Sequence, residues 1–345
     1  MGVIQASGTA RSQFNNMKPT HLTKLLAISF EHQRKVLVKG PPGCGKSEIV
    51  AQAADEAGAD LLISHPAVSD PTDYKGMPAI LPDGTAEFLP FGDLNKLIQA
   101  VKPTICFFDD IGQAPNSVQA ALMQLLQARR VNGHKISDHV LFCGATNDTK
   151  HMAGVAGMLE PVKSRWDTIV ELEASVDDWC VWALDNEIPA ELVAFIRFRP
   201  ALLCDFKPTR ELKNSPCPRT VTAVGNWLKI GVKDYDVIAG AAGEGFATEL
   251  VAFLTMYAQL PNLDTIIMNP DSAPVPQGAA AQYAVITGLA RKSSPGNAER
   301  VFRYIKRLPK EFEVCCVRDI WRVSPAVQQT RAFVDWAARN GDVLT

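Results

Sequence analysis

The sequence lacks an excess of charge of either sign, and it lacks any long hydrophobic run. Its 345 residues include 35 lysines and arginines against 37 aspartates and glutamates, so the formal net charge is only −2. A balance this close gives no general attraction to nucleic acid or to an anionic membrane surface. Because no run of about 18 apolar residues is present, we expect no membrane-spanning helix.

Targeting signals and paired cysteines are missing as well. Residues 1–16 have no apolar core of the kind that a secretory signal needs, and Ala6 does not fit an N-myristoylation motif. The eight cysteines form no Cys-x-x-Cys pair, and the six histidines have no ligand spacing to a cysteine. This distribution is typical of a reduced protein without a zinc site. We therefore expect a cytoplasmic location and no contact with membranes.

What the chain does have is apolar residues, 47% of the total, against 21% charged residues. This composition can fill a packed core, which excludes a disordered protein, and the length favours two domains. Up to about residue 172, short apolar runs alternate with amphipathic helical patterns. That alternation predicts an α/β fold with a five-stranded parallel sheet. The predicted strands are residues 36–40, 60–65, 104–110, 140–147 and 168–173.

Beyond residue 175 the apolar positions recur at helical spacing, which predicts an all-helical part. We therefore expect a flexible N-terminus at 1–17, an α/β core at 18–175, and a helical domain with a C-terminal extension at 176–345. Residues 291–331 contain ten lysines and arginines against four acidic residues. This segment indicates either a basic face for an anionic partner or ordinary solvated helix surfaces.

The strongest local signal is GPPGCGKS at residues 40–47, between an apolar strand and a helical pattern. It matches GxxxxGK[ST], a loop whose glycines let backbone N–H groups point at phosphate oxygens. The N-terminus of the following helix adds free donors. We expect Lys46 to reach the β- and γ-phosphates of a nucleotide and Ser47 to hold Mg²⁺. The predicted nucleotide-binding residues of this loop are Gly40, Pro41, Pro42, Gly43, Cys44, Gly45, Lys46 and Ser47.

Two further strands end in polar residues that suit the chemistry of a nucleotide. The strand at 104–110 ends in Asp109, expected to orient Mg²⁺, and Asp110, expected to polarise the attacking water. Asp110 stands where a longer glutamate is usual, so the contact with water is expected to be longer or the turnover slower. The strand at 140–147 ends in Asn147, placed to contact the γ-phosphate and the water. Taken alone, each of these ends could be a simple turn.

Together these residues resemble an AAA+ ATPase, and within that superfamily the MoxR group, over residues 18–230. The group's DEINRA segment corresponds to FFDDIGQAP here, and its Thr-Asn-Pro sensor to GATND, with Asp148 in place of proline. An insertion typical of the group corresponds to residues 73–97, where PDGT predicts a hairpin turn. A second hairpin is expected within 128–140. In the family both hairpins face the central pore or its rim; two surface hairpins without a contact role are the alternative.

The resemblance also implies roles for two arginines. Arg165, in Ser-Arg-Trp, corresponds to the arginine that reaches the γ-phosphate bound by the neighbouring subunit. Arg219, in Pro-Arg-Thr, corresponds to a sensor on a lid helix that closes over the nucleotide. Either arginine could instead form a surface salt bridge. Arg129 and Arg130 are expected to suit the C-terminal end of a helix, and a contact between subunits is the alternative.

The resemblance implies a P-loop AAA+ core with an all-α lid, in a homo-oligomeric, hexameric ring that hydrolyses ATP with Mg²⁺ at its subunit interfaces. MoxR relatives remodel or activate a protein partner, commonly one with a von Willebrand factor A domain. Two alternatives stay open. A nucleic-acid-translocating motor is favoured by the basic segment 291–331 and disfavoured by the balanced charge, and a nucleotide-dependent switch with little turnover is suggested by Asp110.

Overall fold

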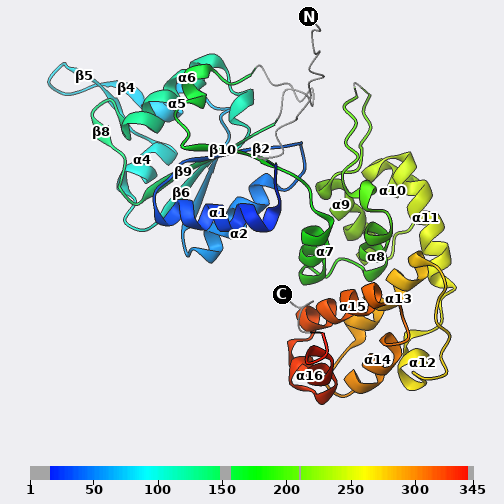
Figure 1. Cartoon of the computed structure of the whole chain (residues 1–345). Coiled ribbons are helices and arrows are strands. Elements are labelled where there is room, and N and C mark those ends of the chain that lie inside the picture. The colour runs from blue at the N-terminus through cyan, green and yellow to red at the C-terminus, as the bar shows by residue number, and fades with distance from the viewer. Residues whose placement is uncertain (1–15, 148–156, 210, 341–345) are drawn as a thin grey trace, which may run out of the picture. The chain divides into compact units, whose positions relative to one another are not determined.

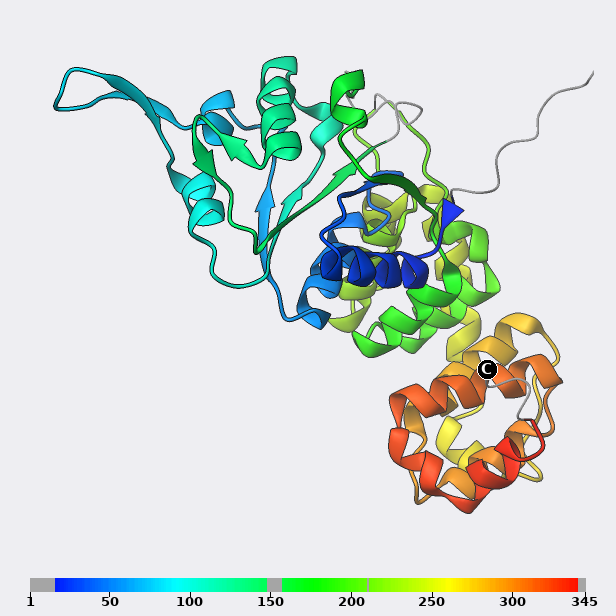
Figure 2. The same ribbon diagram turned by 60° about the vertical axis from the view of Figure 1, so that its left-hand side comes forward.

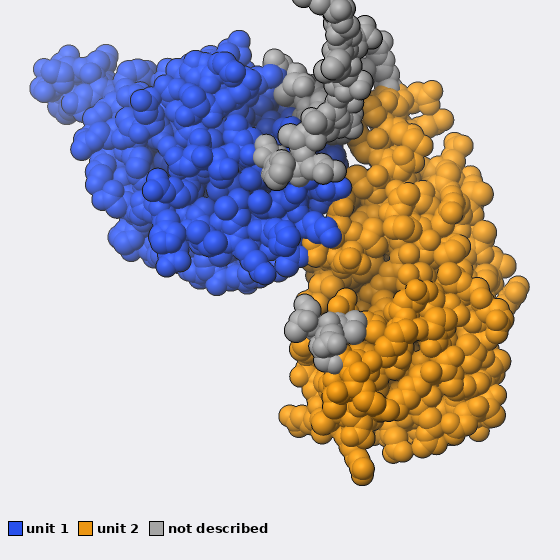
Figure 3. All heavy atoms as spheres, in the orientation of Figure 1, with its two compact units in different colours: residues 1–173 blue, residues 174–345 orange. Residues whose placement is uncertain are grey.

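A parallel six-stranded sheet forms the centre of the first of two structural units, which divide between Glu173 and Ala174 (Figures 1 and 3). The computed structural model describes residues 16–147, 157–209 and 211–340. The strand order is β1-β10-β2-β9-β6-β3. The strands are β1 (Asn16–Met17), β2 (Val36–Lys39), β3 (Asp60–Ser64), β6 (Thr104–Phe108), β9 (Val140–Thr146) and β10 (Thr168–Leu172).

The predicted α/β fold with a parallel sheet is confirmed, but the sheet has a sixth strand. The prediction of a flexible terminus over 1–17 is wrong at its end, because Asn16 and Met17 pair with Glu171 and Leu172 of β10. This short strand covers an edge of β10 whose backbone groups would otherwise lack partners. Two residues are too few to show an alternating pattern in the sequence. Residues 1–15 lie outside the described part of the chain.

Helices cover both faces of the sheet because successive strand residues point to opposite sides (Figure 1). On one face, Val36 and Val38 of β2 pack with Leu22 and Leu26 of α1 and with α2. On the other face, Leu37 packs in a cluster with α3, α4 and α5. The helices of this unit are α1 (Pro19–Glu31), α2 (Lys46–Glu56), α3 (Pro71–Lys75), α4 (Gly92–Gln99), α5 (Asn116–Ala128) and α6 (Glu160–Lys163), with a 3-10 turn at Ile111–Gln113.

Two antiparallel hairpins extend from this unit where the sequence predicts them. The first, β4 (Met77–Ile80) with β5 (Ala86–Leu89), projects well away from the body of the unit (Figures 1 and 2). Asp83 closes its turn by accepting hydrogen bonds from the backbone N–H and the hydroxyl of Thr85. The second hairpin, β7 (Arg130–Val131) with β8 (His134–Lys135), is shorter.

The second unit contains helices and, among its described residues, no strand. None of the helices described in the chain is long and apolar enough to cross a bilayer. The helices are α7 (Val176–Asp185), α8 (Ala190–Phe198), α9 (Pro218–Lys229), α10 (Tyr235–Ala242), α11 (Glu244–Ala258), α12 (Leu263–Met268), α13 (Ala279–Lys292), α14 (Ala298–Ile305), α15 (Lys310–Val323) and α16 (Arg331–Ala337), with 3-10 turns at Pro200–Leu203 and Pro325–Gln329.

This helical unit has two cores that meet at α13. Helices α7 to α11 enclose one core and α12 to α16 the other, while α13 gives Ala284 to the first and Val285 to the second. A buried ion pair joins them, because Arg197 of α8 donates to both carboxylate oxygens of Asp319 on α15, at 2.5 and 2.7 Å. Burial alone lowers the pKa of Arg197, but the Asp319 carboxylate outweighs it, so the pKa is raised.

Candidate functional site

The predicted phosphate loop links the end of β2 to the start of α2. Gly43 has a φ of 70° and Gly45 a φ of 97°, both in the left-handed region that glycine adopts without steric cost. Gly45 is the N-cap of α2, so the first N–H groups of that helix face the loop. Cys44 is buried among the apolar residues beneath. Such a turn at a helix N-terminus is suited to bind phosphate.

Lys46 lies under this loop with only 6% of its surface exposed. Its ammonium donates to the carbonyl of Gly40 at 3.1 Å, to the carbonyl of Pro41 at 2.9 Å and to Oδ1 of Asn147 at 2.8 Å. A buried cation is tolerated when hydrogen bonds compensate its lost hydration. The three acceptors therefore fix the position of the Lys46 ammonium beneath the loop.

The end of β6 supplies two carboxylates that point in different directions. Oδ2 of Asp109 accepts a hydrogen bond of 2.7 Å from the hydroxyl of Ser47. Asp110 has a φ of 54°, a left-handed conformation that is uncommon outside glycine but less so for aspartate. In this conformation Oδ1 of Asp110 accepts a 2.9 Å hydrogen bond from Nδ2 of Asn147.

A continuous chain of hydrogen bonds therefore runs from Ser47 through Asp109, Asp110 and Asn147 to Lys46. Its members come from the start of α2, which follows β2 through the phosphate loop, and from the ends of β6 and β9; the three strands are neighbours in the sheet. The carboxyl ends of parallel strands share one edge, and ligands of open α/β sheets bind there. The fold thus brings together five residues that the sequence predicts for one site.

The donor set at this edge fits Mg²⁺. A hydroxyl from Ser47 and a carboxylate from Asp109 lie 2.7 Å apart, and both are the oxygen ligands that this ion prefers. Mg²⁺ uses few protein ligands and completes its shell with water and phosphate oxygens. Accordingly, the described residues contain no cluster of three or more histidine, cysteine or acidic side chains able to hold a metal.

The two predicted arginines do not join this chain of hydrogen bonds. Arg165 follows α6, where Nη2 donates to Oε1 of Gln127 on α5 at 2.7 Å and Nη1 donates to the carbonyl of Pro161. Arg219 is the second residue of α9 in the helical unit, and its side chain is exposed. Asp148, the residue after Asn147, lies outside the described residues.

Two polar residues near the site have structural roles that the sequence did not suggest. Gln119, buried in α5, donates to the carbonyls of Ala114 and Gly157 and accepts from the N–H of Leu159, which ties the segment before α6 to α5. A glutamine within an amphipathic helix gives no signal of such a role. Arg129 is the C-cap of α5, at the helix end where it was expected. Its guanidinium also donates to the carbonyls of residues 137 and 140 beyond the second hairpin.

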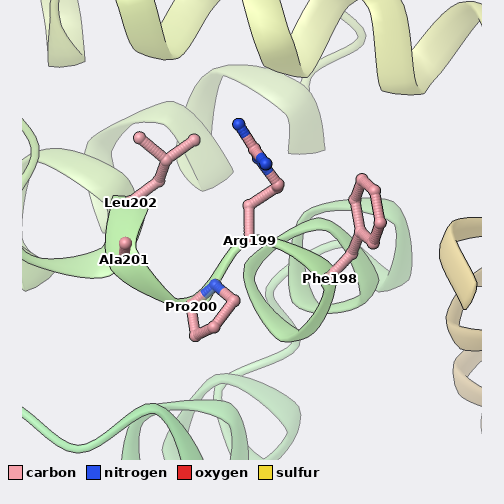
Figure 4. A pocket seen from close by; sticks show the side chains of 5 residues that line it. All are labelled: Phe198, Arg199, Pro200, Ala201 and Leu202. Atoms are coloured by element: carbon pink, nitrogen blue, oxygen red, sulfur yellow. The ribbon is translucent and has the colours of Figure 1, made fainter.

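Two surface hollows lie elsewhere. One is lined by Glu160, Pro161, Lys163 and Ser164, beside Arg165. The other lies in the helical unit, where Phe198 and Arg199 at the end of α8 line it together with Pro200, Ala201 and Leu202 of the turn that follows (Figure 4). Arg199 forms an ion pair with Glu249 there, so the carboxylate already compensates the positive charge of Arg199. Neither hollow is lined by residues 40–47, so neither belongs to the phosphate loop.

Comparison with known proteins finds a similarity in the first unit. The family model described as the AAA domain of the dynein-related subfamily matches residues 35–165. No curated protein matches the sequence significantly. Among solved structures, the chain is similar to a mutant of RuvB from Thermotoga maritima, with 16% identity and a TM-score of 0.43 over 78% of this chain and 80% of that one. It is also similar to NtrX from Brucella abortus in complex with ADP, with 14% identity and a TM-score of 0.36 over 94% and 68%. Both similarities are distant.

Proposed function

We propose that this protein is an AAA+ ATP hydrolase whose subunits form a ring and remodel or activate a protein partner. The observation that carries the proposal is the hydrogen-bonded chain from Ser47 to Lys46 at the carboxyl edge of the sheet. It gathers a cation for phosphates, oxygen ligands for Mg²⁺ and a carboxylate for water. The match of the AAA domain model to residues 35–165 supports the same reaction.

The residues of the loop bind and position the substrate. Lys46 neutralises charge on the β- and γ-phosphates, and its bonds to the carbonyls of Gly40 and Pro41 keep the ammonium beneath the loop. Ser47 and Asp109 would hold Mg²⁺, which when bound neutralises charge on the phosphate oxygens. Positioning and charge stabilisation are the main requirements of phosphoryl transfer.

Asp110 and Asn147 act on the attacking water. Asp110 accepts a hydrogen bond from the water and polarises it, while the amide of Asn147 holds the carboxylate in place through Oδ1. Because an aspartate is one methylene shorter than the usual glutamate, we propose that turnover is slow. A nucleotide-dependent switch is the limiting case of slow turnover, and the measured rate decides between them.

Arg165 completes the site of the neighbouring subunit. Its hydrogen bonds run to Gln127 and Pro161 and leave it outside the chain that ends at Lys46, as expected for a residue that serves another subunit. An arginine finger of this kind is worth about 10³–10⁵ in rate. Arg219 is proposed to contact the nucleotide from the helical unit. The MoxR-type hexamer and the partner with a von Willebrand factor A domain rest on the sequence resemblance.

The hairpin β4–β5 supports a protein partner. Its large apolar side chains are exposed, with Ile80 at 82%, Met77 at 52% and Phe88 at 41%. Exposed apolar groups collected on one projecting element mark sites of contact with other proteins. We propose that this hairpin contacts the partner, and that the protein acts in the cytoplasm.

The basic segment 291–331 gives less support to a nucleic-acid partner than its composition suggests. Acidic residues from outside the segment pair with its cations, for example Asp264 with Lys292 at 2.7 Å and Asp271 with Arg303 at 3.1 Å. Asp185 pairs in the same way with Arg322. A count of charges along the chain misses these partners.

The test is the steady-state ATPase rate at several protein concentrations, with Lys46→Ala as the inactive reference. We expect a rate that rises more than linearly with protein concentration, because each site needs a neighbour. Equal rates for the wild type and Lys46→Ala would contradict the hydrolase. Stimulation by duplex DNA that falls steeply with salt would instead favour a nucleic-acid motor.

A further inference from the structure

Trp166, the residue after Arg165, is buried with its ring against the backbone of β9. An ideal Cβ built on Gly144 would lie 2.7 Å from Cη2 and 3.0 Å from Cζ2 of Trp166, closer than real Cβ atoms come. The indole and the glycine therefore fit only as a pair. Nε1 of Trp166 is shielded from solvent and has no acceptor within the described residues, so the ring serves by its shape.

Gly144 occupies a central position in the sheet. Its partners in the register are Leu37 of β2 on one side and Phe108 of β6 on the other. Three residues further along β2 the phosphate loop begins, and the residue after Phe108 is Asp109. Asn147 follows Gly144 by three residues. The ring of Trp166 thus contacts Gly144, which lies between Leu37 and Phe108 in the sheet. The strands of these three residues all lead to the nucleotide site.

The two sides of this contact are held with different strength. β9 is hydrogen-bonded to a strand on each side, so the contact with Trp166 adds little to its position. The turn that carries Arg165 is short and follows the four residues of α6. Within the turn, Arg165 donates to the carbonyl of Val162 and Trp166 to that of Lys163, at 3.2 and 3.3 Å, and beyond it Asp167 is bonded to the backbone of Lys35. A seated ring therefore matters more to the turn than to the strand.

We propose that Trp166 is a positioning residue, which fixes Arg165 for the neighbouring subunit by seating its ring on Gly144. This inference rests on the proposed function, in which Arg165 acts on the neighbour's nucleotide. Trp166 and Gly144 then serve the nucleotide site of the neighbouring subunit, which Arg165 completes. They do not serve the nucleotide site of their own subunit. Neither residue touches the substrate.

The contact between Trp166 and Gly144 can be disrupted and restored by changing the sizes of the two side chains. Gly144→Ala pushes the ring and the turn away, and a displacement of about 1 Å near a catalytic group costs up to about 100-fold in rate. We expect Gly144→Ala to lower turnover by about 10- to 100-fold. Trp166→Phe, which is shorter at the point of contact, should restore turnover in the double variant to within about threefold of wild type. Trp321→Phe, on the exposed side of α15, is the matched control and should leave turnover unchanged.

The mixing of variant subunits decides which site the pair serves. Lys46→Ala subunits lack a working site but supply Arg165, whereas Arg165→Ala subunits hold a working site but supply no arginine. An equal mixture of Gly144→Ala with Lys46→Ala should recover about a quarter of the wild-type rate, because an active interface needs one intact site beside one intact arginine. A mixture of Gly144→Ala with Arg165→Ala should stay as slow as Gly144→Ala alone.

Each outcome has a distinct meaning. Recovery with Arg165→Ala but not with Lys46→Ala overturns the inference, since the pair would then serve the subunit's own site. Failure of Trp166→Phe to rescue Gly144→Ala, with both proteins folded and binding a fluorescent ATP analogue, overturns it as well. If the reference mixture of Lys46→Ala with Arg165→Ala stays inactive, the proposed action of Arg165 between subunits fails, and this inference falls with it.

Discussion

The two units of the chain bury polar side chains in different arrangements. In the α/β unit, Lys46 is buried at the start of α2 and Asn147 just after β9, and their hydrogen bonds connect to Asp110. In the helical unit, Arg197 and Asp319 form a closed pair between helices. The first arrangement lies at the edge of a sheet beside a loop, where a ligand can replace a partner. The second is enclosed, so we expect it to contribute to stability and not to chemistry.

The comparison predicts that substitutions in the first unit reduce activity and that those in the second reduce stability. Lys46→Ala should produce the largest effect, a loss of at least about 10³ in ATPase rate, because Lys46 supplies the positive charge of the hydrogen-bonded chain. The far-ultraviolet circular dichroism should stay that of the wild type. A rate within tenfold of wild type would contradict the site.

Arg165→Ala should follow with a loss of about 10³ in turnover. Its affinity for a fluorescent ATP analogue should stay within about twofold of the wild-type value, because Arg165 lies outside the subunit's own chain of hydrogen bonds. Lys163→Ala, a neighbouring exposed cation paired with Glu160, is the matched control and should leave both quantities unchanged. A loss of nucleotide affinity as large as the loss of turnover would place Arg165 in its own subunit's site.

In the helical unit, Asp319→Leu should lower the free energy of unfolding by about 3–5 kcal/mol, since it leaves Arg197 buried and uncompensated. Adding Arg197→Met should recover most of that loss, because two apolar side chains then replace the ion pair. Arg303→Ala, which removes exposed pairs with Asp271 and Glu299, should cost less than about 1 kcal/mol. Urea unfolding followed by tryptophan fluorescence measures all three. An unchanged stability in Asp319→Leu would remove the contrast between the units.

Asp110→Glu tests a smaller difference within the site. The added methylene brings the carboxylate closer to the water, so we expect turnover to rise by a few-fold, within about tenfold. Asp110→Asn keeps the size but loses the base and should be nearly inactive. If Asp110→Glu is as slow as Asp110→Asn, the left-handed turn at Asp110 requires the shorter side chain.

The smallest effect concerns a thiol of the helical unit. Burial raises the pKa of Cys315 to about 11, so its reactive thiolate is scarce at pH 8. Its rate of alkylation in the native protein should therefore keep rising about tenfold per pH unit up to pH 10, whereas an ordinary thiol levels off near pH 8.5. Mass spectrometry of labelled peptides measures the rate. A plateau near pH 8.5 would show that α15 opens easily.

The central strands of the α/β unit, though not its edge strand β1, and the meeting of Lys46, Ser47, Asp109, Asp110 and Asn147 could be predicted from the sequence. Apolar runs mark the central strands, and parallel strands place Asp109 and Asn147 at a common edge. The seating of Trp166 on Gly144 could not be predicted, because a glycine inside an apolar strand does not show what approaches it. The ion pairs of the basic segment 291–331 could not be predicted for a similar reason, because acidic partners such as Asp185 are remote in the sequence.

The central claim is that ATP is hydrolysed at a site which two subunits share. The most direct test mixes Lys46→Ala with Arg165→Ala subunits, each inactive alone, and measures the ATPase rate of the equal mixture. The account predicts recovery to about a quarter of the wild-type rate, because that fraction of interfaces joins an intact site to an intact arginine. A mixture that stays as inactive as its components, although both variants assemble with wild-type subunits, would contradict the claim.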